Sequence, residues 1–297
     1  MSTTSTARPA GGPDQGPDGH DARGGRLGRI VRSPLGWMLT GLVGVGLISG
    51  LTATAPGPVP VLGAVAAVAV YWLVMRRVAR RSTPEIARRG AGREALLGGA
   101  TGLGFVLVSA LLITAFGGYS FSWAGHGFVA VVWSAVMVQI GAAVTEELLF
   151  RGLALQALEQ LWGSRAALVI TGLFFGVAHL SAPGASAWSA LAIALEAGVM
   201  LGAAFLWRRS IWFVTGLHFA WNTTEQLLGI PVSGHTPEGL FTVDVHGSAV
   251  LTGGGFGLEA AMVPVVIGVL LAARMFVLAR RGGALLPRRS ARHTEAG

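Results

Sequence analysis

Eight apolar runs dominate this chain and constrain its fold more than any other feature. They lie at about 35–55, 58–75, 95–116, 128–150, 166–180, 187–207, 211–228 and 256–279. Most are close to the ~20 residues that a helix needs to cross a hydrocarbon core. Only 12% of the residues are charged, against about 25% in soluble domains. The sequence therefore predicts an all-α, polytopic membrane helix bundle of about eight transmembrane helices.

The basic residues are sorted by position relative to these runs. All 22 are arginines, and those outside the runs precede run one, lie between runs two and three, four and five, or six and seven, or follow run eight. The other four connections, including 229–255, contain no arginine. Because cytoplasmic loops are enriched in basic residues, we expect a cell-membrane protein with both termini in the cytoplasm. The net charge of +8 then reflects topology, and neither a nucleic-acid partner nor a particular oligomeric state is predicted.

Composition divides the chain into three parts. Residues 1–34 are rich in Ser, Thr, Pro, Gly and Asp with scattered Arg, which predicts a disordered basic cytoplasmic tail. Residues 35–280 form the transmembrane domain, and 281–297 form a second basic cytoplasmic tail. The chain contains no cysteine, so any metal site would have to use His, Asp, Glu or Asn.

Polar residues interrupt three of the runs, in the segments 146–151, 175–179 and 218–222. Ionisable groups inside a membrane are costly and mark candidate functional sites. Glu147 and Arg151 have the i, i+4 spacing of a helical ion pair with the acid first, for which a structural role is the simpler interpretation.

Helix geometry predicts that these segments meet. If Gly163 is the pivot of an antiparallel helix pair, Glu146 lies 17 residues before it and His179 lies 16 residues after it. Both then lie about 25 Å from the turn, at 1.5 Å per residue. His218 lies ~13 Å from the preceding arginine pair, and Asn222 lies one turn deeper on the same face.

This set offers the groups that water-mediated peptide hydrolysis requires. Glu146 can accept a proton from water, an imidazole can orient that water or bind a metal, and Asn222 can donate to an oxyanion. Either histidine alone is better explained as an interhelical hydrogen-bond donor. The convergence of the set favours catalysis.

The motifs resemble those of the CAAX-protease and bacteriocin-processing family of intramembrane proteases, also called the Abi family, which includes the type II CAAX prenyl endopeptidases. The family pattern is Glu-Glu followed by Arg, then Phe-x-x-x-His, then His-x-x-x-Asn or Asp, and all three occur here in that order. The resemblance covers about residues 128–228, which form a protease-like core.

The resemblance implies a role for each matching residue. Glu146 would activate water, His179 would help to bind that water, and His218 and Asn222 would bind water or a metal or donate to the oxyanion. Glu147 and Arg151 would support these groups. Two alternatives remain for the cofactor: Zn²⁺ or another divalent metal bound by His179, His218 and Glu146, or a metal-free site.

The leading hypothesis is a membrane endopeptidase that cleaves a membrane-associated or lipidated protein or peptide and is reached from the cytoplasmic side. The alternatives are a non-proteolytic scaffold or bacteriocin self-immunity factor of the same family, and a small transporter with a buried proton relay. Glu259 and His235, in an arginine-free connection, are expected to be solvated.

Overall fold

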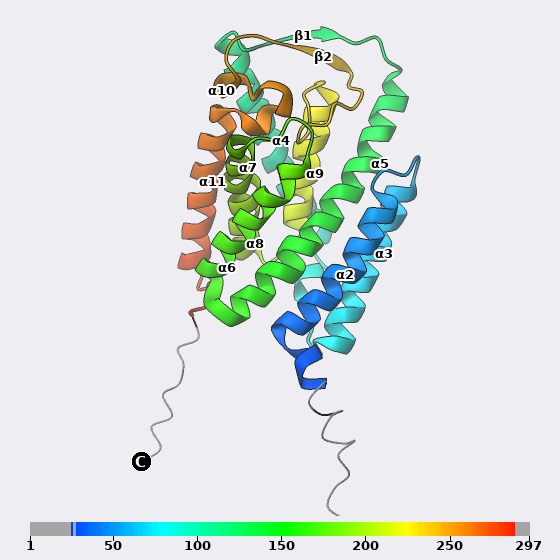
Figure 1. Ribbon diagram of the computed structural model, residues 1–297, viewed down its shortest axis with the longest axis vertical. Helices are drawn as coiled ribbons and strands as arrows, with labels where there is room; N and C mark the ends of the chain where they lie inside the picture. Colours follow the sequence, from blue (N-terminus) through cyan, green and yellow to red (C-terminus); the bar gives the residue numbers. More distant parts are fainter. Residues whose placement is uncertain (1–24, 26–27, 289–297) are drawn as a thin grey trace, which may run out of the picture.

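The protein is a bundle of long helices that run up and down along one axis (Figure 1). The computed structural model describes residue 25 and residues 28–288. The long helices are α2 (Pro34–Thr52), α3 (Val59–Leu73), α4 (Ala91–Ala115), α5 (Phe128–Glu147), α6 (Gln156–Ala178), α9 (Ile211–Leu227) and α11 (Met262–Arg281). Shorter helices are α7 (Ala187–Ile193), α8 (Leu201–Arg208) and α10 (Ala249–Thr252). Wider π-helical turns continue the helices at η1 (Val74–Val78), η3 (Leu148–Leu155) and η5 (Ala194–Met200).

Each predicted apolar run lies largely in helix, which confirms an all-α membrane bundle. Within the described residues, six segments are long and apolar enough to span a membrane: Pro34–Thr52, Val59–Val78, Ala91–Ala115, Phe128–Ser181, Ala187–Arg208 and Met262–Arg281. The fourth segment contains two predicted runs, and α9, the seventh run, has 17 residues. The number of crossings therefore stays a prediction.

Local sequence sets several of the helix boundaries. Ser33 accepts a hydrogen bond from the Gly36 amide and precedes Pro34, which is a favourable first residue of a helix. Ser210 caps α9 in the same way. Gly163 has φ 81° and ψ 165°, a conformation that glycine adopts most readily. The chain therefore reverses at the predicted pivot.

One end of the bundle, which we call the sheet end, carries the connections 53–58, 116–127, 182–186 and 228–261. Strand β1 (Tyr119–Trp123) pairs antiparallel with β2 (Phe241–Val245), so that Tyr119 faces Val245. The Trp188 indole donates to the Ala260 carbonyl at 2.8 Å. Long-range contacts thus bring these connections together at the top of Figure 1.

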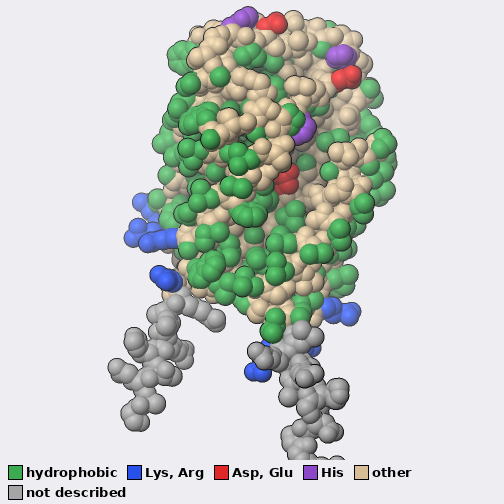
Figure 2. Space-filling model, in the orientation of Figure 1, with side chains coloured by type: hydrophobic (Ala, Val, Ile, Leu, Met, Phe, Trp, Pro, Cys, Tyr) green, Lys and Arg blue, Asp and Glu red, His purple; other side chains and the backbone are tan. Residues whose placement is uncertain are grey.

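The opposite end, which we call the arginine end, carries the connections 79–90, 156–163, 209–210 and 282–288. Arg208 donates to Glu94 at 3.0 Å, Arg209 donates to Glu159 at 2.7 Å, and the Trp212 indole donates to a backbone carbonyl of the 79–90 connection at 3.1 Å. On the face in Figure 2, arginines gather at the lower end and acidic and histidine side chains at the upper end. The sorting of the arginines is present in the structure, whereas the cytoplasmic placement of the termini stays a prediction.

The structure departs from the sequence expectations in two places. The two-stranded sheet was not predicted, although Tyr-Ser-Phe-Ser-Trp and Phe-Thr-Val-Asp-Val alternate in the manner of strands. Residues 28–32, in the segment predicted as an N-terminal tail, are helical. The remainder of the predicted N-terminal tail up to residue 27 (residue 25 apart) and residues 289–297 lie outside the described residues.

Candidate active site

Two adjacent glutamates end α5 at the point where the chain widens into the π-helical turns of η3. Such turns occur often at functional sites. The Glu147 side chain is fully buried, whereas the Glu146 side chain is 31% exposed. The two carboxylates therefore have different surroundings, and only Glu146 can meet a ligand.

Glu147 forms the predicted ion pair with Arg151. Arg151 Nη1 lies 2.9 Å from Glu147 Oε1, and the two side chains are 2% and 0% exposed. Arg151 Nη2 donates to the carbonyls of Ala197 and Gly198 in η5 at 2.6 and 3.2 Å. Since a buried charge needs a partner, this pair with its carbonyl contacts fixes η3 against η5.

Glu147 has a second partner, His218, that the sequence did not reveal. His218 Nδ1 lies 2.9 Å from Glu147 Oε1. Both residues were expected inside the bilayer. Because they lie on two separate helices, α5 and α9, helical spacing could not predict that their side chains meet. With Nδ1 donating to the carboxylate, the other ring nitrogen turns toward Glu146, and Nε2 lies 4.0 Å from Glu146 Oε2.

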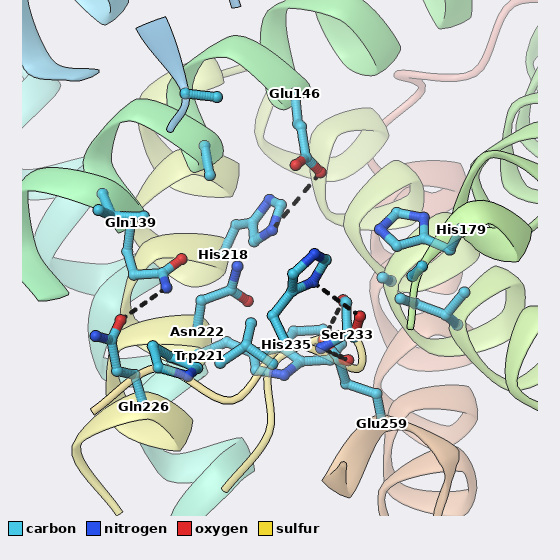
Figure 3. Close-up of a pocket in the computed structure, with 18 of the residues that line it drawn as sticks. Gln139, Glu146, His179, His218, Trp221, Asn222, Gln226, Ser233, His235 and Glu259 are labelled. Carbon is cyan, nitrogen blue, oxygen red and sulfur yellow. Dashed lines mark hydrogen bonds and ion pairs between the residues drawn. The ribbon is translucent and has the colours of Figure 1, made fainter. Parts of the chain in front are cut away.

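His179 approaches from the end of α6. Its Nδ1 lies 2.8 Å from the Phe175 carbonyl, and its ring stacks on the Phe175 ring with centroids 4.7 Å apart. Because a carbonyl only accepts, Nδ1 carries the proton and Nε2 is free for another partner. Figure 3 shows Glu146, His179 and His218 extending into one space from three helices.

That space is a cavity of 530 Å³. Glu146, His179, His218 and Asn222 all line it, so the structure brings the predicted site residues together. Asn222, one turn beyond His218 on α9, is buried. Much of the remaining wall is apolar and includes Ala53, Val138, Ala142, Phe175, Ala178, Ala182, Ile193, Ala197, Trp221 and Val232.

Glu259 also lines the cavity, and the expectation that it is solvated is wrong. It is 3% exposed, and its carboxylate accepts from the Ser233 amide at 2.6 Å and from Ser233 Oγ at 3.1 Å. Burial raises the pKa of Glu259, against the opposing effects of His179 and the Ser233 hydrogen bonds. His235 is exposed, as expected, but it belongs to the same cavity wall. The connection after α9 folds back over the site, which composition alone does not reveal.

A glutamine pair completes the polar lining. Gln139 Nε2 donates to Gln226 Oε1 at 2.9 Å, and both side chains are buried. The bond joins α5 to α9 beyond the site residues (Figure 3). Sequence reasoning missed this pair because uncharged amides in apolar helices give a weak signal.

His179, His218 and Glu146 are the candidate ligands of a metal ion at this site. Among residue 25 and residues 28–288, no group of three or more His, Asp or Glu side chains could hold a metal ion. His218 Nδ1 is bound to Glu147, which leaves Nε2, 4.0 Å from Glu146 Oε2, as the ring nitrogen that could bind a metal. The metal set of His179, His218 and Glu146 stays a prediction, and no step below passes through a metal.

Part of the cavity wall comes from the sheet end. The residues of this part are Ala53, Ser181, Ala182, Val232, Ser233, His235, Pro237 and Glu259, all from sheet-end segments or their borders. None comes from the connections of the arginine end. Access to the site from the cytoplasmic side, which the sequence led us to expect, stays a prediction.

Comparison with known proteins agrees with the motifs. Residues 128–224 match a family model described as type II CAAX prenyl endopeptidase Rce1-like. No curated protein and no solved structure matches the chain significantly. The matched segment includes the residues of all three motifs, from Glu146 to Asn222. Residues 128–224 of this multi-pass membrane protein are therefore similar to the type II CAAX prenyl endopeptidase family, a family of membrane proteases.

Proposed function

We propose that the protein is an intramembrane endopeptidase in which Glu146 activates a water molecule for attack on a peptide bond. One observation carries the proposal: a partly exposed carboxylate faces the free nitrogen of His218, whose other nitrogen is bound to the buried Glu147–Arg151 pair. A carboxylate that orients a histidine in this way fixes its tautomer and stabilises its protonated form. An ion pair of Glu147 and Arg151 with only a structural role would not need the additional bond from Glu147 to His218.

In the proposed reaction, water loses a proton to the Glu146 carboxylate as its oxygen attacks the substrate carbonyl carbon. The tetrahedral intermediate carries its negative charge on the former carbonyl oxygen. The proton on Glu146 then passes to the amide nitrogen, the carbon–nitrogen bond breaks, and an amine and a carboxylic acid leave the site. Atoms and charges balance without a further reactant.

The other site residues orient water and stabilise charge. His218 Nε2 lies where it can hydrogen-bond a water beside Glu146. Asn222 supplies an amide donor from the same helix, and His179 supplies a ring nitrogen from the facing side of the cavity. Donors aimed at a developing oxyanion contribute large rate effects in a site from which bulk water is excluded.

The substrate class follows from the cavity wall. Its apolar surface, interrupted by a few polar groups, suits an extended polypeptide segment with apolar side chains or an attached lipid. The name of the matched family includes prenyl substrates, and for this chain a prenylated substrate is one form of the proposal. A protein or peptide substrate is common to every form.

The experiment compares protein termini in membranes of cells that produce the parent protein or Glu146→Gln. Mass spectrometry should detect new termini that depend on Glu146 and so identify substrates. Glu238→Gln is the matched control, because Glu238 is an exposed acid of the sheet end and its replacement should leave those termini unchanged. Identical termini with the parent and Glu146→Gln, at equal abundance of folded protein, would refute proteolysis and favour a scaffold or immunity factor.

A further inference from the structure

We propose that the protein binds an anionic phospholipid at the arginine end, on the face formed by α6, α8 and α11. An acyl chain would lie in an apolar groove between these helices, and the phosphate would lie in an adjoining hollow lined by arginines. Neither space shares a lining residue with the cavity that contains Glu146. The inference is therefore independent of the proposed proteolytic function.

The first observation is the apolar groove, which has a volume of 330 Å³ and is formed by α6, η5, α8 and α11. Apart from Arg165, every residue that lines it is apolar. Ala203 and Ala272 are buried, whereas Val169 and Val269 are exposed. The exposed residues belong to α6 and α11, which are part of segments apolar enough to span a membrane. Since hydrocarbon chains surround such helices in a bilayer, the groove suits an acyl chain.

The second observation is the hollow, which has a volume of 590 Å³ and lies between the helix turn at Gly163 and the segment after α11. Arg165, Arg280 and Arg288 line it, and no acidic residue of the described chain does. Arg165 also lines the groove, so the two spaces adjoin at its side chain. Guanidinium groups form strong hydrogen bonds with phosphate oxygens. A ligand with a phosphate at one end and an apolar chain at the other would fill both spaces.

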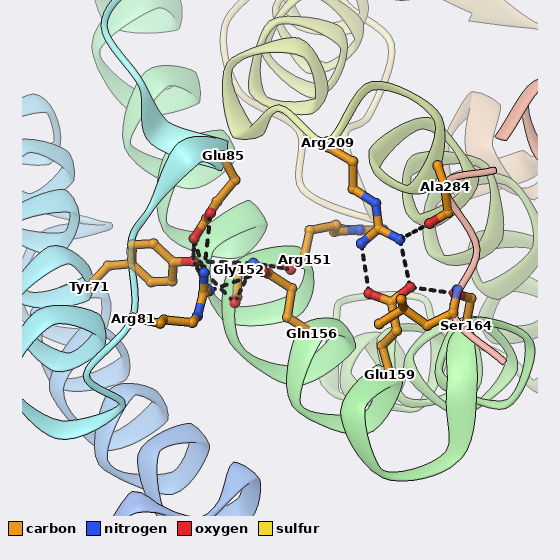
Figure 4. Close-up of polar contacts among 11 residues, drawn as sticks. Tyr71, Arg81, Glu85, Arg151, Gly152, Gln156, Glu159, Ser164, Arg209 and Ala284 are labelled. Carbon is orange, nitrogen blue, oxygen red and sulfur yellow. Dashed lines mark hydrogen bonds and ion pairs between the residues drawn. The ribbon is translucent and has the colours of Figure 1, made fainter. Parts of the chain in front are cut away.

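The positive charges of the hollow are not neutralised by carboxylates of the described residues. None of the ion pairs among residue 25 and residues 28–288 includes any of the three arginines. Glu159 accepts a hydrogen bond from Ser164 in this hollow, but its carboxylate is already paired with Arg209 at 2.7 Å (Figure 4). The hollow therefore has an excess of positive charge that an anionic ligand would balance.

Specific contacts hold the wall of the hollow in place. The Ser164 amide donates to the Leu286 carbonyl at 3.1 Å, and the Leu286 amide donates to Ser164 Oγ at 2.7 Å. A Cβ atom at Gly163 would lie 2.8 Å from the Arg288 nitrogen, so glycine allows the segment after α11 to pass directly over the helix turn. The arginine after α11 is thereby held beside the arginine of α6.

The order of apolar and basic residues along the helices matches the order of chain and headgroup in a phospholipid. On α11, Val269–Phe276 covers about 10 Å of the groove at 1.5 Å per residue, and Arg280 follows one turn later. Trp162, which is exposed beside the hollow, is of the residue type enriched at headgroup depth. Basic pockets between membrane helices bind anionic headgroups. A soluble anion would leave the groove unused, and a zwitterionic headgroup would bring a cation toward the arginines.

Native mass spectrometry of the full chain in detergent measures the affinity for added phosphatidylglycerol and for phosphatidylcholine with the same acyl chains. We expect tighter binding of phosphatidylglycerol. Arg165→Gln should weaken that binding by about fivefold, the scale of one arginine near an anionic headgroup. Arg89→Gln is the matched control, because Arg89 is an exposed arginine of the same end that lines neither space. Equal affinity for the two lipids, or an equal loss in the two variants, would overturn the proposal.

A second pair of variants separates a lipid from a soluble anion. Val269→Phe adds bulk within the groove, whereas Val266→Phe makes the same change at an exposed position of α11 outside it. Because both valines are exposed, both variants should fold. We expect Val269→Phe alone to weaken binding of phosphatidylglycerol, and inorganic phosphate at the concentration of the lipid to leave the lipid bound. Displacement by phosphate together with unchanged binding by Val269→Phe would identify a soluble-anion site and refute the proposal.

The lipid site and the proposed function can fail separately. Glu146→Gln should bind phosphatidylglycerol as the parent does, because Glu146 lines neither the groove nor the hollow. Loss of lipid binding in Glu146→Gln, at equal amounts of folded protein, would place the lipid in the cavity of Glu146 and overturn the proposal. Absence of Glu146-dependent termini with the parent would refute proteolysis and leave the lipid site intact.

Discussion

The sheet end and the arginine end of the bundle close their connections by different means. At the arginine end, buried carboxylates bind arginines that are distant in sequence, as Glu159 binds Arg209. At the sheet end, backbone bonds between β1 and β2 and one carboxylate clasp, Glu259 with Ser233, arrange the loops around an open cavity. The difference shows that ion pairs hold the connections of one end together, whereas backbone pairing and a carboxylate clasp arrange those of the other end around the site cavity.

The candidate site lies between a buried ion pair and the cavity. Glu147 and Arg151 belong to the sealed interior, while Glu146 faces the cavity. His218 touches both carboxylates. Substitutions should therefore separate effects on catalysis from effects on folding.

The largest expected effect is catalytic. In Glu147→Gln an amide oxygen can still accept from Arg151 or His218, but the charge that stabilises protonated His218 is lost. We expect the initial cleavage rate of a Glu146-dependent substrate to fall by about 100-fold or more, the scale of positioned acid–base groups. The rate is measured in membranes with equal amounts of folded protein. An unchanged rate would show that Glu147 is only a structural partner.

Arg151 should be the most sensitive position for stability. Arg151→Met leaves the Glu147 charge buried without its ion-pair partner, and such losses cost about 3–5 kcal/mol. Arg208→Met is the matched control, because the Arg208 and Glu94 side chains are 26% and 18% exposed and such pairs contribute about 0–1 kcal/mol. Thermal unfolding in detergent measures both. Equal losses would contradict the distinction between buried and surface pairs.

The sequence predicted the helices and the gathering of the four site residues because both follow from simple periodicities. Apolar runs of membrane-spanning length identify the helices, and Gly163 sets the reversal that places Glu146 and His179 at equal depth. The ion pair of Glu147 with Arg151 also follows from helical spacing.

The missed features all depend on contacts between segments without a shared period. His218 meets Glu147 across two helices that are 71 residues apart in sequence. Glu259 becomes buried only because a long connection turns back so that Ser233 covers it. The part of the cavity wall that comes from Val232, Ser233 and His235 depends on that same return.

Glu159 tests how firmly the arginine end is sealed. In Glu159→Gln, one of the two Arg209 hydrogen bonds loses its acceptor oxygen, and a buried position that is 3% exposed keeps an unmatched amide. We expect a loss of about 1–3 kcal/mol of stability and faster proteolysis near Gly163 by a protease added to inverted vesicles. Ser181→Ala, an exposed sheet-end change, should alter neither measurement. Unchanged stability of Glu159→Gln would show that the network does not hold this end.

Glu259 should give the smallest effect and the one that depends on pH. Burial raises the pKa of Glu259 above its ordinary value of 4.5, so the stability from the neutral acid is present below that value and is lost as pH rises through the raised pKa. Glu259→Gln remains neutral and can keep both contacts with Ser233. The melting temperature of Glu259→Gln minus that of the parent should therefore increase by about 2–4 °C as pH rises through this range. Glu238→Gln, which replaces an exposed acid, should show no such trend. A difference that is constant or falls with pH would mean that the Ser233 hydrogen bonds outweigh burial, and the clasp would then favour the ionised acid at the mouth of the cavity.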